Sequence, residues 1–151
     1  MTDPSDSHTP ISTALMLYDG LCGFCNWTVR WVIERDRHDR FRFAPQQSAI
    51  AEAVLARHGV DRQAMLAANS VYLVLGYDLP GEQLLCRSDV TVQILRLLGG
   101  GWELLGRLLG AVPRFLRDAG YTLIARIRFR LAGRYDSCPI PSAAERMKFL
   151  A

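Results

Sequence analysis

Cys22 and Cys25 mark the boundary between two predicted elements, and this placement restricts the fold more than any other feature of the sequence. The apolar run at 15–18 ends at an Asp-Gly turn signal, as expected of a short buried strand. From 24 to 36, apolar residues recur at helical spacing, with three aromatic side chains on one face: Phe24, Trp27 and Trp31. The cysteine pair therefore lies between the end of a strand and the start of a helix.

The remaining segments continue an alternation of strands and helices. We expect strands at 41–44, 70–76 and 83–86, and helices at 48–57, 88–99, 102–109 and 113–131. Ser88 is a good N-cap for its helix, and Pro113 suits the first position of the last one. The order β-α-β-α-β-β-α predicts an α/β domain with one parallel pair and an antiparallel hairpin, and resembles a thioredoxin-like domain with a C-terminal helical extension.

The length of 151 residues is that of one domain with a real hydrophobic core. Residues 1–12 are polar and contain no apolar stretch of a secretory signal, so we expect a disordered N-terminal tail. The domain is then 13–151, with 98–151 as the helical extension packed on it. No apolar run reaches the roughly 18 residues of a membrane span. Because the chain lacks a secretory signal and its four cysteines are not spaced like a disulfide scaffold, we expect a cytoplasmic protein.

The position of the cysteine pair predicts thiol chemistry. The thiolate attacks a disulfide, and an ordinary cysteine is mostly protonated near pH 7. Unpaired N–H groups and the positive end of the dipole at a helix N-terminus favour the thiolate. We therefore interpret Cys22 as the nucleophile and Cys25, one turn later and facing inward, as the resolving thiol.

Two other interpretations of the cysteines remain open at this point. Zinc prefers four nitrogen or sulfur ligands, and Cys22, Cys25, Cys86 and Cys138 could form an all-thiolate set in a binding module without redox activity. Alternatively, the chain is an interaction protein whose cysteine pair has no redox partner. Structural zinc sites usually use two closely spaced pairs, whereas the second two cysteines here are far apart, so we favour a redox pair that needs no metal.

The excess of basic residues is concentrated in the C-terminal third of the chain. Between Glu103 and Arg134 there are seven arginines against two acidic residues, one of them Asp118. A solvated helix face explains this excess best. An RNA or a membrane surface is the less favoured interpretation, because aromatic residues are sparse among the arginines. We therefore expect no nucleic-acid partner.

The sequence Y-D-G-L-C-G-F-C at 18–25 resembles the DCC family of thiol-disulfide oxidoreductases, in which such a motif follows the first strand. Later matches to the family pattern are Ser88, Pro113, the set Tyr121, Ala125 and Arg128, and the ending Cys138, Pro141, Arg146, Phe149 and Leu150. The resemblance covers about 13–151. It implies a thioredoxin-like fold and dithiol-disulfide exchange with a protein or a low-molecular-weight thiol, without a cofactor.

The resemblance also adds candidate residues around the pair. It favours Asp19 as a catalytic residue that accepts the proton of the resolving thiol, although a turn role explains this residue as well. Tyr121 and Arg128 share a helix face with spacing that suits packing, and Arg128 near the thiols would favour a thiolate. Ser88 and Cys138 complete the accessory set, with Cys138 as a third thiol or as part of a strap.

One feature of thioredoxins is missing from this sequence. They place a proline directly before the third strand, beside the redox pair, where it helps to shape the substrate groove. Residues 68–70 (Ala-Asn-Ser) contain no proline. We therefore expect a substrate to be held differently here.

Overall fold

A computed structural model describes residues 14–68, 70–134 and 146–150. The expected tail at 1–12 and the candidate Cys138 lie outside the described residues.

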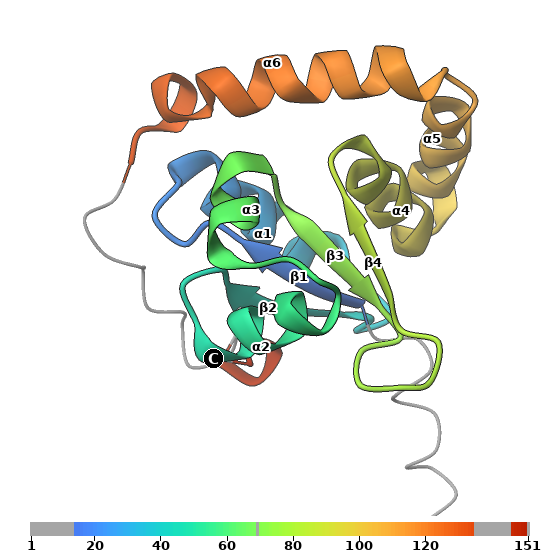
Figure 1. The fold of residues 1–151 in the computed structure, drawn as a ribbon. Helices are drawn as coiled ribbons and strands as arrows, with labels where there is room; N and C mark the ends of the chain where they lie inside the picture. Colours follow the sequence, from blue (N-terminus) through green and yellow to red (C-terminus); the bar gives the residue numbers. More distant parts are fainter. Residues whose placement is uncertain (1–13, 69, 135–145, 151) are drawn as a thin grey trace, which may run out of the picture.

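A four-stranded mixed sheet forms the centre of the domain (Figure 1). Its order is β2-β1-β3-β4, made of β2 (Phe41–Pro45), β1 (Ala14–Tyr18), β3 (Tyr72–Leu75) and β4 (Gln83–Cys86). β1 pairs with β2 in parallel, and the other two pairings are antiparallel. The expected parallel pair and antiparallel hairpin are therefore confirmed.

Helices cover both faces of the sheet, which explains why β1 is apolar throughout. Alternate residues of β1 enter two separate clusters, because successive side chains of a strand point to opposite faces. Ala14, Met16 and Tyr18 pack with α1 (Gly23–Arg35) and α4 (Ser88–Leu98). Leu15 and Leu17 pack with α2 (Ala49–Arg57) and α3 (Arg62–Ala68). This is a thioredoxin-like α/β fold.

Two further helices follow α4 in the region of the expected extension. They are α5 (Gly100–Gly110) and α6 (Arg114–Ala132), and a short 3-10 helix, η2 (Arg146–Lys148), follows near the C-terminus. Gly99 and Gly100 have φ of 75° and 59°, so the chain turns there in a conformation that strains any other residue. α6 crosses over the domain in contact with α1 and α4 (Figure 1).

The structure corrects three local expectations. The segment 58–69 was not assigned a helix, but α3 forms there, with Asp61 Oδ1 accepting the N–H of Ala64 at 2.7 Å. Arg87, not Ser88, is the N-cap of α4 and makes no side-chain cap, and the Ser88 hydroxyl bonds instead to the carboxylate of Asp118 on α6. α6 begins with the residue after Pro113, whose carbonyl accepts the N–H groups of Leu116 and Arg117.

Candidate active site

Cys22 and Cys25 lie at the N-terminus of α1, directly after the loop that leaves β1. Cys22 is the N-cap residue, with extended backbone, and its Sγ accepts the N–H of Cys25 at 3.3 Å. The Asn26 side chain donates to the carbonyl oxygens of Gly20 and Cys22, each at 2.9 Å, and so fixes the loop. Both cysteines are free thiols and both are buried.

The surroundings of Cys22 favour its thiolate. They lower its pKa from the ordinary 9.0 to about 6. The largest cause is the hydrogen bond from the Cys25 thiol, and the N–H groups of Cys25 and Phe24 and the charge of Arg128 act in the same direction, against the effect of burial. Cys22 is therefore ionised at neutral pH.

Cys25 is affected in the opposite direction. Its hydrogen bond to Cys22 raises its pKa, and burial and the Cys22 charge raise it further, with Arg128 opposing them. The pair therefore holds one proton at neutral pH, on Cys25. Near neutral pH the pair therefore consists of a thiolate at Cys22 and a thiol at Cys25.

Arg128 of α6 connects the cysteine pair to Asp19. Its Nη1 donates to Cys25 Sγ at 3.2 Å, and its Nη2 lies 3.2 Å from Asp19 Oδ2. Asp19 is held in place because its Oδ1 accepts the N–H of Leu21 at 3.0 Å and the amide of Gln47 at 2.9 Å. The structure thus brings together four of the sequence-predicted residues from two segments of the chain, 19–25 and α6.

Tyr121 and Ser88 hold α6 onto the domain at two other points. The Tyr121 hydroxyl accepts the N–H of Val71 at 3.0 Å and lies 3.3 Å from Ser70 Oγ, and burial raises its pKa. This contact lies just before β3, where thioredoxins carry their proline. Ser88 bonds to Asp118 of α6. Within the part of the chain that the structure describes, the hydrogen bonds of Tyr121 and Ser88 join α6 to the domain and do not reach a cysteine sulfur.

The end of α6 covers the cysteine pair. Gly23 N–H donates to the carbonyl of Gly133 at 3.0 Å, and Cys22 forms an isolated antiparallel bridge with Arg134. Cys22 is consequently 0% exposed. Sequence reasoning missed this cover, and its one signal is Gly23: a Cβ at that position would lie 2.1 Å from the Ala132 carbonyl oxygen.

A Gly23→Ala substitution is therefore expected to uncover Cys22. The added methyl group forces 132–134 away from the cysteine, and overpacking of this kind costs about 1–3 kcal/mol. Iodoacetamide should then alkylate Cys22 about tenfold faster, as followed by mass spectrometry. Gly120→Ala on α6 is the control, because a Cβ there meets no atom within 4 Å. Equal alkylation rates in both variants would contradict the covering role.

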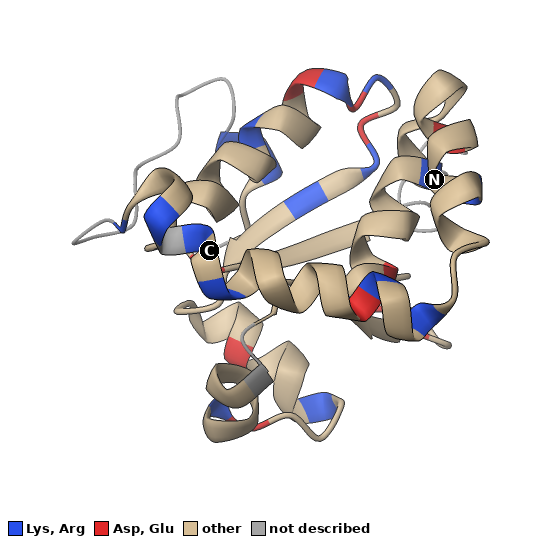
Figure 2. Cartoon of the chain, turned by 90° about the horizontal axis from the view of Figure 1, so that it is seen from above, with Lys and Arg blue, Asp and Glu red and all other residues tan. Residues whose placement is uncertain are grey.

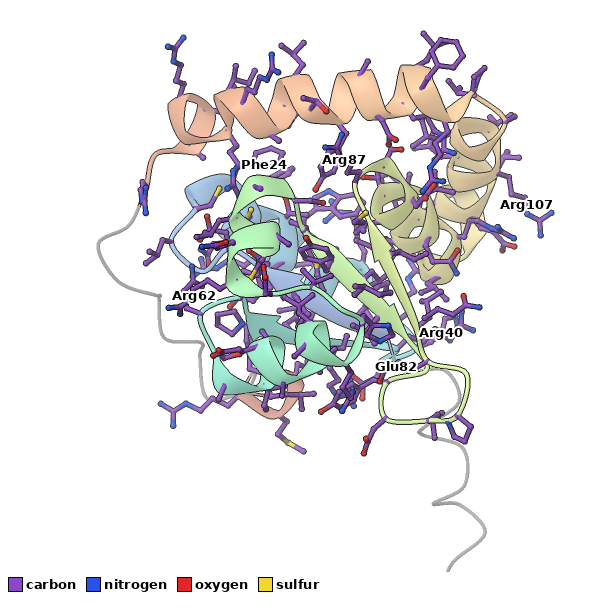
Figure 3. All side chains as sticks on the ribbon, viewed as in Figure 1. Phe24, Arg40, Arg62, Glu82, Arg87 and Arg107 are labelled. Atoms are coloured by element: carbon purple, nitrogen blue, oxygen red, sulfur yellow. The ribbon has the colours of Figure 1, made fainter. Side chains whose placement is uncertain are left out.

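A cavity of about 380 Å³ reaches Cys25 from another side. It lies between α1, α4 and α6, and Cys25, Tyr121 and Arg128 line it together with apolar side chains. One of these is Phe24, which lies between α1 and α6 (Figure 3). A cavity of this size admits a small molecule but not a folded polypeptide.

Cys86 is separated from the pair by the sheet. It packs with the cluster of Leu15 and Leu17, whereas Cys22 and Cys25 belong to the cluster on the other face. Among the residues that the structure describes, no three His, Cys, Asp or Glu side chains gather as a metal site. The fourth member of the alternative zinc set, Cys138, lies outside them.

The fold and the site define a thioredoxin-like protein with two cysteines at the N-terminus of its first helix. The family model "DCC1-like thiol-disulfide oxidoreductase" matches residues 16–134, and the chain belongs to this family. The resemblance of the 18–25 motif is thereby confirmed.

Two relatives support the family assignment. The chain is 29% identical over 140 residues to the uncharacterized protein YuxK of Bacillus subtilis, covering 93% of this chain and 96% of that protein. It is 31% identical over 126 residues to the DCC family protein At1g52590, chloroplastic, of Arabidopsis thaliana, covering 83% and 69%. No solved structure gives a significant match. Among the described helices, none is both long and apolar enough to cross a membrane.

Proposed function

We propose that this protein is a cytoplasmic thiol-disulfide oxidoreductase that cycles Cys22 and Cys25 between dithiol and disulfide. The observation that carries the proposal is the opposite shift of the two thiols, with the pKa of Cys22 lowered to about 6 and that of Cys25 raised. This asymmetry supports attack by Cys22 and resolution by Cys25 in the proposed cycle. The partner is a protein or a low-molecular-weight disulfide.

The proposed reaction has two exchange steps. The Cys22 thiolate attacks one sulfur of the substrate disulfide, forms a mixed disulfide, and releases the first substrate thiolate. Cys25 then gives its proton to the first released thiolate, directly or through water, and attacks Cys22 Sγ, which breaks the mixed disulfide and releases the second thiolate. Two electrons pass to the substrate, and the protein ends with a Cys22–Cys25 disulfide. The reverse sequence oxidises a dithiol substrate.

Arg128 and Asp19 support the second step in this proposal. Ionisation of Cys25 creates a buried negative charge, and the Arg128 guanidinium already donates to that sulfur. Asp19 holds the same guanidinium from its other side. Because Arg128 stands between them, we assign Asp19 as a positioning residue rather than as the direct proton acceptor.

Asp19→Asn is expected to slow the resolving step about tenfold, because a lost charge-assisted bond of about 1.5–3 kcal/mol loosens Arg128. Stopped mixing with oxidised glutathione, followed by acid quench and mass spectrometry, separates the decay of the mixed disulfide from its formation. The pH at which this decay is half-maximal should rise, which a purely structural role would not produce. Glu34→Gln removes an exposed carboxylate as the control. An unchanged decay rate and pH profile in Asp19→Asn would rule out the role.

The pH dependence of Cys22 alkylation tests the proposed function. Iodoacetamide reacts with a thiolate and not with a thiol. A lowered pKa of Cys22 therefore keeps the alkylation rate high as the pH falls, until the pH drops below the pKa of Cys22 in the folded protein. The rate with iodoacetamide should be half-maximal near pH 6 rather than near 9.0. After reaction with oxidised glutathione, Cys22 and Cys25 should both become resistant to alkylation, because they form a disulfide with each other. A half-maximal rate near 9.0 with no Cys22–Cys25 disulfide would refute the proposal.

A further inference from the structure

The helix α6 turns several polar side chains toward the domain, beside the apolar Ile124 and Ala125 that line the cavity. The residues that face inward include Asp118, Tyr121 and Arg128, which hold the contacts described above. Five of the exposed side chains on α6 are large and apolar: Phe115, Leu116, Leu123, Ile124 and Leu131. Phe115 is 72% exposed and Leu123 is 61% exposed. An ordinary surface helix has the reverse arrangement.

The exposed apolar residues continue on α5 and the short link to α6. They are Leu104, Leu105, Leu108 and Val112, and Leu108 is 61% exposed. So many exposed apolar side chains on two successive helices are unusual for a surface that contacts only solvent, and they indicate a contact surface. We call the exposed apolar residues of 104–131 the outer face.

The charges on and beside the outer face are basic. Arg126 and Arg130 are exposed on α6 next to Leu123 in the helical repeat, and Arg107 projects outward from α5 (Figure 3). Figure 2, which looks down on the domain, shows basic residues toward both ends of α6. Asp118 is engaged with Ser88, and Glu103 forms an ion pair that offsets the charge of Arg107. Arg126 and Arg130 therefore carry the net positive charge of the outer face.

We propose that the outer face lies against an anionic lipid surface, with α6 parallel to the membrane plane. Exposed leucines and phenylalanine enter the boundary between headgroups and acyl chains, and arginines beside them bind the lipid phosphates. A second copy of this chain suits the face less well, because a two-fold contact would bring the same arginines together. The sequence favoured a solvated face for this segment, because it could not show which side of α6 turns inward.

This placement would also bring the redox site near the membrane. Ile124 belongs to the outer face and lines the cavity that reaches Cys25, together with the exposed Trp27. The lipid contact itself does not depend on the thiol chemistry, so each can fail without the other.

Flotation with lipid vesicles tests the proposal on the full chain. Vesicles of phosphatidylcholine with phosphatidylglycerol should bind the protein at low ionic strength, and vesicles of phosphatidylcholine alone should bind it more than about tenfold less, because each arginine near an anionic surface contributes about fivefold. Added salt should weaken the binding. No enrichment on the anionic vesicles would overturn the proposal.

Variants distinguish specific vesicle binding by the outer face from nonspecific hydrophobic adsorption. Leu116→Ser combined with Leu123→Ser should weaken vesicle binding about tenfold or more, and so should Arg126→Glu combined with Arg130→Glu. Leu66→Ser is the matched control, because Leu66 of α3 is 68% exposed and lies outside the outer face. Circular dichroism verifies that each variant is folded. If the double leucine variant does not fold, the double arginine variant still tests the proposal. An equal loss of vesicle binding in Leu66→Ser would contradict the lipid contact. So would a protein that binds no vesicles but forms a stable dimer, if the double leucine variant is monomeric.

Discussion

Cys22→Ser is expected to abolish disulfide reduction, whereas Cys25→Ser should stop the reaction after its first step. A serine hydroxyl is not ionised near neutral pH and cannot replace the thiolate, so the rate should fall by at least about 1,000-fold. In Cys25→Ser the nucleophile remains but the resolving thiol is lost. A mixed disulfide on Cys22 should therefore accumulate. Single-turnover reaction with oxidised glutathione, followed by mass spectrometry, distinguishes the two outcomes.

Cys86→Ser is the control for this pair of variants. Cys86 lies on the opposite side of the sheet from Cys22, so its replacement should leave both steps unchanged. Retained turnover in Cys22→Ser, or a mixed disulfide that forms on Cys86 instead, would contradict the assigned nucleophile. A mixed disulfide also identifies the partner when the Cys25→Ser variant is exposed to extract from its own cell.

Most of the domain could be predicted because its signals are local. The apolar runs that gave β1 and β3 and the helical spacing of α1 lie within single segments, so the pattern of each segment indicates its own structure. The position of Cys22 at the N-terminus of α1 follows from the same local pattern. The helix α3 was missed because it is short, and its N-cap, Asp61, is not followed by a long apolar repeat.

The parts of the site that depend on α6 could not be predicted from spacing. Arg128 lies 103 residues after Cys25, and only the packing of α6 across α1 brings the two together. The same packing brings Asp118 to Ser88, whose hydroxyl was predicted to cap its own helix. Long-range contacts of this kind depend on the free energy of the whole fold and not on a local pattern.

Arg128→Met is expected to weaken both the fold and the reactivity of Cys22. Arg128 and Asp19 are 11% and 14% exposed in their side chains, so removal of the cation leaves a nearly buried carboxylate without its ion pair. The loss should be on the order of 3 kcal/mol in the free energy of unfolding. Because Arg128 also lowers the pKa of Cys22, that pKa should rise from about 6 toward its ordinary value. Urea unfolding measures the first effect, and the pH dependence of alkylation measures the second.

Comparison of three variants separates the charge of Arg128 from its geometry. Arg128→Lys keeps a cation but has a single ammonium group in place of the planar fork that reaches Cys25 and Asp19 at once, so it should restore the Cys22 pKa in part and the stability less. Arg126→Met removes an arginine two positions away, on the exposed side of α6, and should change neither quantity. A loss of stability in Arg128→Met with the pKa of Cys22 still near 6 would leave Arg128 a purely structural role. If the pKa of Cys22 rises in Arg128→Met and is partly restored in Arg128→Lys, the positive charge at position 128 is what stabilises the Cys22 thiolate. The reaction would then require α6 to be packed in place, because α6 carries that charge.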